Sequence, residues 1–229
     1  MEINKLLTTI NYRKGTNKVN KYLAIHFVGA LGGAEANCKY FQSVYRGASA
    51  HYFVGHKGEV WQCVNDEDIA WHVGATRYKH PYCRNDNSIG IEMCCRKKAD
   101  GTWYFEEATV KATIELAKEL MKKHNIPIGN VIRHYDVTGK NCPEPYVRDT
   151  AAWNAFKASV FTTPTPVASG YKVKITADTL NVRKGAGVSY KVVTQVKKNE
   201  VYTIVQESNG WGKLKSGAGW IKLSYTKKV

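Results

Sequence analysis

The chain has 229 residues, of which 43% are hydrophobic and 11% aromatic, and its formal net charge is +15. This apolar content excludes a disordered chain and is enough for one sizeable core plus a second, small domain. The sequence has no apolar run long enough to span a bilayer, and its N-terminus lacks a basic region followed by an apolar stretch. We therefore expect a protein made in the cytosol without a signal peptide, whose export would need outside help.

The early part of the chain alternates between predicted strands and helices. Apolar runs predict strands at residues 22–28, 51–54, 59–64, 88–94 and 130–134. Apolar side chains at helical spacing predict amphipathic helices at residues 34–45 and 106–124. Helices interspersed with strands indicate an α/β sheet.

The pattern changes after a segment rich in proline and threonine. Residues 162–170 contain two prolines and small polar residues, which favour an extended spacer. Beyond them only short strands are predicted, at residues 171–177, 180–183, 191–196, 201–206, 211–214 and 219–223. We therefore predict a first domain at 1–160, a linker at 161–170 and a small all-β barrel at 171–229.

The positive charge predicts a polyanionic partner, which could be nucleic acid, anionic lipid or an acidic cell-wall polymer. Residues 170–229 carry 12 Lys and Arg against 3 Asp and Glu, so we expect this quarter to do the anchoring. Nucleic acid is disfavoured because the basic residues are scattered and no nucleic-acid-binding motif accompanies them. The six cysteines are too sparse for a disulfide framework, and five of them are predicted to be buried or half-buried thiols.

The segment at residues 133–143 combines side chains that could bind a metal. Cys142 lies eight positions after His134, with Lys140 between them, and one short loop could gather all three. Thiolate and neutral imidazole are both good zinc ligands, and a hydrolytic zinc site has three protein ligands and an open position. His26, near the end of an apolar strand, is the candidate third ligand. Singly, the histidines could instead be hydrogen-bonded strand-end residues and Cys142 a small buried hydrophobe.

Glu92 stands in an otherwise apolar strand, where a carboxylate is expensive to bury. It could be a structural acid, a metal ligand or a general base, and beside a zinc site we favour the base. Lys140 is predicted to stabilise negative charge on a carbonyl oxygen, although a lone lysine is more often a solvated loop residue.

Trp71 and His72 precede a glycine outside any strong periodicity and are predicted to line a cleft that contacts a sugar or peptide. Core packing of Trp71 is equally compatible with the sequence. His51 is interpreted as a core histidine or as one that supports the metal site from behind.

Several short motifs follow one another in the first 160 residues: Ile25-His26, Ser49-Ala50-His51-Tyr52, Trp71-His72-Val73-Gly74, Asn87-Ser88-Ile89-Gly90-Ile91-Glu92, and His134-Tyr135-Asp136 through Lys140-Asn141-Cys142-Pro143. Together they resemble the type 2 zinc N-acetylmuramoyl-L-alanine amidases, a superfamily that includes phage endolysins and peptidoglycan recognition proteins. The resemblance implies a mixed sheet flanked by helices. It also implies cleavage of the amide between N-acetylmuramic acid and L-alanine in bacterial peptidoglycan.

By residue, the resemblance implies Zn²⁺ at His26, His134 and Cys142, with Glu92 and Lys140 in the cleft. Some phage members have a catalytic tyrosine where this chain has Ala50, which shifts the base role toward Glu92. Members that bind without cleaving typically lack the cysteine ligand, and Cys142 is present here.

The tail resembles a bacterial SH3 domain through residues 180–187, 210–214 and 219–221. Such domains imply binding to cell-wall peptide or polymer, although Trp211 and Trp220 could simply form its core. The expected protein is a monomeric phage or prophage endolysin that reaches the wall after release by a holin-type pore, or else an autolysin. A peptidoglycan-binding recognition protein without catalysis is the alternative.

Overall fold

The computed structural model describes residues 1–161, 165–188, 190–208 and 210–229, and gives only the backbone of residues 165–169. It divides into two compact units, Met1–Trp153 and Asn154–Val229. None of the helices in these described ranges is both long and apolar enough to cross a membrane.

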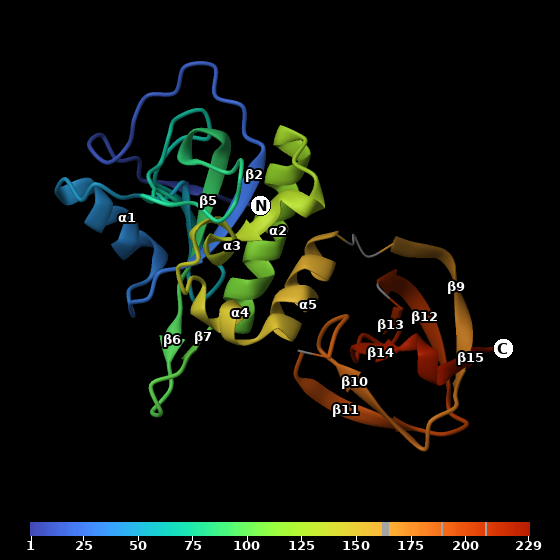
Figure 1. Cartoon of the computed structure of the whole chain (residues 1–229). Coiled ribbons are helices and arrows are strands. Elements are labelled where there is room, and N and C mark those ends of the chain that lie inside the picture. Colours follow the sequence, from blue (N-terminus) through green and yellow to red (C-terminus); the bar gives the residue numbers. More distant parts are fainter. Residues whose placement is uncertain (162–164, 189, 209) are drawn as a thin grey trace. The chain divides into compact units, whose positions relative to one another are not determined.

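The first unit is built on a six-stranded mixed sheet (Figure 1). The strand order is β1–β4–β3–β5–β2–β8, where the strands are β1 (Asn4–Lys5), β2 (Tyr22–Phe27), β3 (Tyr52–Val54), β4 (Val60–Gln62), β5 (Ser88–Met93) and β8 (Val131–Arg133). Strands β3, β5, β2 and β8 run parallel to one another, β4 is antiparallel to β3, and β1 is parallel to β4. The predicted mixed α/β sheet is therefore confirmed.

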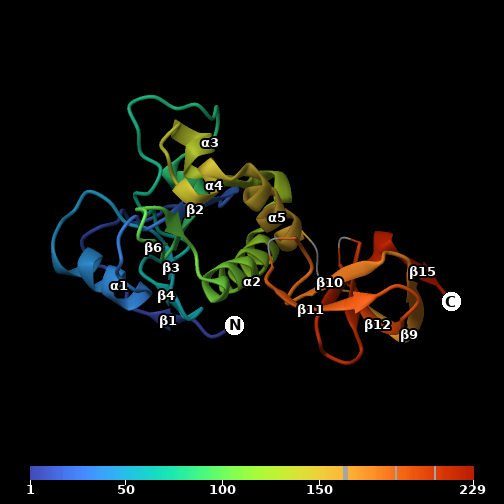
Figure 2. The same ribbon diagram turned by 90° about the horizontal axis from the view of Figure 1, so that it is seen from below.

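Two helices cover opposite faces of this sheet (Figure 2). Phe53 of β3 packs in a cluster with residues of α1 (Ala34–Ser43), whereas the neighbouring Tyr52 faces the end of α2 (Glu107–His124). Successive side chains of β3 thus point to opposite faces of the sheet, one toward α1 and the next toward α2. The last turn of α2 contains three basic residues, which favour a helix C-terminus, and the capping residue Asn125 follows in a left-handed conformation.

Several short elements connect these layers and were not predicted from the sequence. They are η1 (Asn85–Asn87), the hairpin of β6 (Arg96–Lys97) and β7 (Trp103–Tyr104), η2 (Ile128–Asn130), α3 (His134–Thr138), α4 (Glu144–Arg148) and α5 (Thr150–Phe161). Helix α5 runs from the first unit into the second. The segment predicted as one short metal-binding loop is thus a strand end, a five-residue helix and a turn.

The second unit is all-β, as predicted. Its seven strands form one antiparallel sheet, in the order β11–β10–β14–β13–β12–β9–β15. They are β9 (Thr165–Ile175), β10 (Thr179–Arg183), β11 (Val192–Lys197), β12 (Val201–Ser208), β13 (Trp211–Leu214), β14 (Trp220–Lys222) and β15 (Thr226–Lys228), with η3 (Leu223–Tyr225) before the last. The unit has its own apolar core, built around Val182, Ile204 and Ile221.

Part of the range predicted as a linker is a strand. Residues 162–164 lie outside the described residues, and β9 already begins at Thr165, inside the range 161–170. Strand β9 pairs with β12, which supplies hydrogen-bond partners that a sequence pattern cannot reveal. Trp211 and Trp220 are buried, in agreement with the interpretation that they belong to the core of this unit.

Candidate metal centre and active-site cleft

The parallel strands β2 and β8 bring two histidines to the same end of the sheet. Ile25 pairs with Arg133, and His26 and His134 each follow directly. Their rings lie edge to face, with centroids 4.7 Å apart. Neighbouring residues of parallel strands share a face, so the register alone accounts for this proximity.

The turn after α3 returns Cys142 to the two histidines. The Tyr135 amide donates to the Cys142 carbonyl at 2.8 Å, which closes the segment. The Cys142 Sγ lies 3.7 Å from His26 Nδ1, and one ligand atom from each of His26, His134 and Cys142 lies within 4.8 Å of the others. All three side chains are buried.

The chemistry of these three side chains fits a zinc ion. Burial is the main cause that lowers the pKa of His26 well below its usual range and that of His134 to about 4, so both imidazoles are neutral and able to coordinate. The buried His134 Nδ1 has no hydrogen-bond partner among the described residues. Burial raises the pKa of the Cys142 thiol, so a cation would be needed to hold it as a thiolate. An unpartnered ring nitrogen beside a thiol and a second imidazole is a donor set that zinc prefers.

Glu92 lies next to this group on β5. It pairs with His26 in the β2–β5 register, and its Oε1 is 3.9 Å from His26 Nδ1. Its Oε2 is buried and has no partner in the described part of the chain. Burial raises the pKa of Glu92 to about 7, against the opposing effect of the Lys140 charge. A carboxyl group that titrates near neutrality can both accept and return a proton.

A cleft opens over the candidate metal centre. Trp71, Arg77, Asn85, His134 and Lys140 are among its lining residues. Lys140 is exposed and lines this cleft; its charge opposes the rise in the pKa of Glu92 and adds to the lowering of the pKa of His134. Trp71 is half-buried, with its ring 6.0 Å from that of Tyr45, and Tyr45 is exposed.

His72 has a different environment from its neighbour Trp71. It contributes to the cleft lining but is only 7% exposed. Its Nδ1 is 3.1 Å from His26 Nε2, and its Nε2 is 3.2 Å from Ser88 Oγ. Both ring nitrogens therefore face protein atoms, and a direct contact between His72 and a substrate stays a prediction.

Ala50 is not among the residues that line this cleft. It is 1% exposed and belongs to the apolar cluster that β3 and β4 form with α1. The position where the resemblance raised the question of a catalytic tyrosine is therefore a core position in this chain. The six cysteines are all buried and free, as was predicted for five of them.

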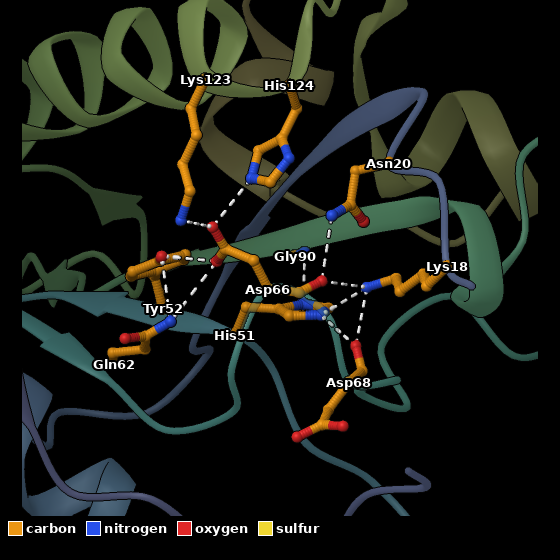
Figure 3. Close-up of polar contacts among 10 residues, drawn as sticks. All are labelled: Lys18, Asn20, His51, Tyr52, Gln62, Asp66, Asp68, Gly90, Lys123 and His124. Carbon is orange, nitrogen blue, oxygen red and sulfur yellow. Dashed lines mark hydrogen bonds and ion pairs between the residues drawn. The ribbon is translucent and has the colours of Figure 1, made fainter. Parts of the chain in front are cut away.

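A second buried polar group lies beside the candidate metal centre, and we call it the Asp66 cluster (Figure 3). His51 Nδ1 accepts the Gly90 amide at 3.0 Å, and His51 Nε2 lies 2.9 Å from Lys18 Nζ. The cluster comprises Lys18, His51, Tyr52, Asp66 and Asp68, with Lys123 and His124 at the end of α2. His51 is thus buried, as the sequence indicated, and its ring is 5.5 Å from that of His72.

Within this cluster the Asp66 carboxylate has four side-chain partners, of which Gln62 Nε2 is the farthest at 3.4 Å. Tyr52 Oη donates at 2.6 Å, and Lys123 Nζ and His124 Nε2 each lie 2.8 Å away. Burial alone would raise the pKa of Asp66, but these hydrogen bonds and the Lys123 charge lower it. The sequence carries no signal for this group, because Lys123 and His124 lie 57 and 58 residues from Asp66 in the chain.

Two histidines and a cysteine that could hold a metal ion, with a carboxylate beside them at one end of a mixed α/β sheet, are a donor set suited to hydrolysis. Comparison with known proteins gives the family. A family model described as N-acetylmuramoyl-L-alanine amidase matches residues 15–145, which is more than half of the chain. This chain therefore belongs to the N-acetylmuramoyl-L-alanine amidase family. A second model, described as bacterial SH3 domain, matches residues 178–227.

Individual relatives agree with the family match. A probable N-acetylmuramoyl-L-alanine amidase from Bacillus licheniformis is 34% identical over 149 residues, which cover 61% of this chain and 41% of that protein. The structure of PlyL is similar with a TM-score of 0.60 and 27% identity, over 71% of this chain and 98% of that one. A mutant endolysin from Bacillus subtilis is similar with a TM-score of 0.57 and 28% identity, over 70% of this chain and 99% of that one. The chain spans about two fifths of the length of the first curated relatives it matches.

Proposed function

We propose that this chain hydrolyses the amide bond between N-acetylmuramic acid and L-alanine in bacterial peptidoglycan. The observation that carries the proposal is the meeting of His26, His134 and Cys142 within 4.8 Å, beside a carboxyl group whose pKa burial raises to about 7. Membership of the amidase family supports the choice of bond. The proposed zinc ligands are these three residues.

A zinc ion held there would polarise the scissile carbonyl and supply an activated water. Glu92 accepts the proton of the attacking water and returns it to the amide nitrogen as the carbon–nitrogen bond breaks. Lys140 donates a hydrogen bond to the carbonyl oxygen while negative charge develops there. The products are the free carboxylate of the lactyl group and the free amino group of L-alanine.

The cleft wall suits a glycopeptide. Trp71 offers a half-buried aromatic face beside the exposed Tyr45, and such faces pack against sugar rings or peptide. We assign substrate contact to Trp71 on this basis. The occupant would be the muramic acid residue or the first residues of the stem peptide.

The second unit is proposed to hold the enzyme on the wall. Lys174 of β9 pairs with Lys227 of β15, and Lys172 lies on the same face two residues earlier. Like charges directly opposite one another are unfavourable, so this face is suited to bind an anionic wall polymer. Tethering raises the effective concentration of the catalytic unit at an insoluble substrate.

The full protein would act as a phage or prophage endolysin or as an autolysin. The similarity to an endolysin from Bacillus subtilis supports the first of these. A monomer made in the cytoplasm and released to the wall remains our working proposal.

The decisive experiment digests purified cell walls with the native protein, with Glu92→Ala and with Cys142→Ser, and identifies the new chemical ends. We expect free L-alanine amino groups without new reducing sugars, and loss of this release in both variants. Zinc should be present at about one equivalent in the native protein and be much reduced in Cys142→Ser. Cys38→Ala, which changes another buried cysteine outside the cluster, should retain the zinc.

Two results would contradict the proposal. New reducing ends would indicate a glycosidase, and unchanged release by both variants would remove the assigned site. A protein that binds walls equally well with and without metal, and never cleaves them, would instead be a recognition protein.

Wall anchoring has its own test. Lys172→Glu, Lys174→Glu and Lys227→Glu combined should weaken wall binding at low salt, and the difference from the native protein should shrink as salt screens the charges. Lys57, exposed on the first unit, gives a matched control when changed to Glu. Equal binding by the triple variant and the native protein at every salt concentration would refute this role.

A further inference from the structure

His72 connects the candidate metal centre to the interior of the sheet. Its Nδ1 lies 3.1 Å from the Nε2 of His26, the ring nitrogen that points away from Cys142. Its Nε2 lies 3.2 Å from Ser88 Oγ, and Ser88 Oγ is in turn 2.5 Å from the Arg84 carbonyl oxygen. A continuous chain of polar contacts therefore runs from a candidate ligand to the backbone.

The direction of every hydrogen bond in this chain follows from its far end. A carbonyl oxygen can only accept, so the Ser88 hydroxyl donates to Arg84. Ser88 Oγ then accepts from His72 Nε2–H, which leaves His72 Nδ1 without a proton in the neutral ring. His72 Nδ1 must accept from His26 Nε2–H, and His26 Nδ1 is left with its lone pair free. That Nδ1 is the atom nearest to Cys142 Sγ and Glu92.

The surroundings of His72 hold its ring in this orientation. Asn85 Oδ1 accepts the backbone amides of His72 at 3.1 Å and Val73 at 2.8 Å. The ring packs on Gly90, where an added Cβ would lie 2.6 Å from His72 Cγ. Ser88, Gly90 and Glu92 alternate along β5 and so share one face. One face of this strand thus provides the acceptor for His72, the space for its ring and the proposed general base.

We propose that His72 is a positioning residue, which with Ser88 fixes the tautomer and orientation of His26 so that Nδ1 faces the zinc position. The proposal rests on the proposed function, because it assigns a purpose to His26 as a zinc ligand. Metal-binding histidines commonly donate their second ring N–H to an outer partner, and loss of that partner typically weakens metal affinity 10- to 100-fold. Here the outer partner is another imidazole, whose own orientation is set by a serine.

The test measures zinc affinity of the full chain by competition with a chelator of known affinity. His72→Leu removes the acceptor for His26 Nε2–H and should weaken zinc binding by roughly 10- to 100-fold. His72→Asn places an amide oxygen near the former Nδ1 position and should recover most of that loss. Ser88→Ala removes only the last link and should have a smaller effect than His72→Leu.

Ser49→Ala is the matched control. Ser49 is buried like Ser88 and its Oγ accepts the Trp71 amide at 3.0 Å, so it supports the same segment without touching an imidazole. Zinc affinity should stay within about twofold of the native value in this variant. If Ser49→Ala weakened zinc binding as much as Ser88→Ala, then the packing of the segment around Trp71 would set zinc affinity, and not the hydrogen bonds through His72.

A second readout does not depend on zinc or on activity. Nitrogen-15 chemical shifts of the metal-free protein should show His26 protonated at Nε2, and this preference should weaken in His72→Leu and return in His72→Asn. The proposal is overturned if His26 carries its proton on Nδ1, or if Asn at position 72 is no better than Leu. If the native protein binds no zinc, the proposed function fails, while the tautomer measurement still decides the role of His72.

Discussion

Two carboxylates of the first unit, Glu92 on β5 and Asp66 in a turn after β4, have pKa values shifted in opposite directions. Both are largely removed from solvent, yet the pKa of Glu92 is raised to about 7 while that of Asp66 is lowered. Asp66 is met by a tyrosine, a lysine and a histidine at hydrogen-bonding distance. Glu92 keeps one buried oxygen without a partner among the described residues. Burial acts alike on both, so the number of donors decides the sign.

In this fold a structural carboxylate and a reactive one differ in how many of their hydrogen bonds are made. A carboxylate with its hydrogen bonds made contributes to stability and has little left to offer a substrate. A carboxyl group whose hydrogen bonds are left unmade costs stability and stays available for proton transfer. His51, a member of the Asp66 cluster, joins the two regions, since it contacts Lys18 on one side and lies against His72 on the other.

Of the substitutions that would distinguish Glu92 from Asp66, we expect the largest effect for Glu92→Gln. Loss of the general base should lower amide hydrolysis by about 10²- to 10⁴-fold. The melting temperature should not fall, because the change removes a buried carboxyl group with an unpartnered oxygen. Release of L-alanine amino groups and thermal unfolding would be measured on the same sample. A Glu92→Gln variant that is destabilised but fully active would show that Glu92 is the structural carboxyl group and not the general base.

Asp66→Asn should show the opposite behaviour. It leaves Lys123 and His124 without their carboxylate. Because the Lys123 side chain is 63% exposed, we expect the free energy of unfolding at pH 7 to fall by about 2 kcal/mol. Because the folded pKa of Asp66 lies below the unfolded value near 3.9, its contribution is present above that pH and is lost as the pH falls through the folded pKa. Urea unfolding at pH 7 and pH 3 should therefore show a difference that shrinks in acid.

Lys18 makes the stability of the Asp66 cluster depend on pH in the alkaline range. Burial lowers its pKa from 10.5 to about 8, although the nearby acidic groups, Asp66 first among them, oppose the shift. Between pH 8 and 10.5 the unfolded chain binds a proton that the folded chain does not, so stability should rise with pH in that window. In the native protein we expect the free energy of unfolding to rise by roughly 2 kcal/mol between pH 8 and pH 10.5. Lys18→Met should not show this rise, and urea unfolding of both proteins across this pH range would measure the difference. If the free energy of unfolding changed with pH in the same way in both proteins, the lowered pKa of Lys18 would be contradicted.

Tyr52→Phe should have the smallest effect. It removes the 2.6 Å hydrogen bond to Asp66 and the hydroxyl that accepts from Gln62 Nε2. Lys123 and His124 stay in place, so the expected loss is about 1 kcal/mol. In the background of Asp66→Asn the same change should cost less, because the two residues share one interaction. Strict additivity would mean that Tyr52 and Asp66 act independently.

Much of the first unit could be predicted from the sequence. The apolar run that ends at His26, the periodicity of the helix now seen at Glu107–His124 and the apolar strand around Glu92 are local signals, since each records which side chains face a core. The helices α3 and α4 have five residues each, which is too short for a periodic pattern. The early start of β9 depends on its pairing with β12.

The sequence by itself determined the two-part organisation, the α/β and all-β classes and the residues from which a zinc site could be assembled. Only the tertiary structure decided how these residues meet: the β2–β8 register places His26 beside His134, and a turn returns Cys142 to both. It also directed the ring of His72 toward His26 and Ser88, and gave Asp66 the donors that Glu92 lacks. Residue types set which chemistry is possible, but distances between strands far apart in the chain set which hydrogen bonds are made, and those bonds decide charge and tautomer.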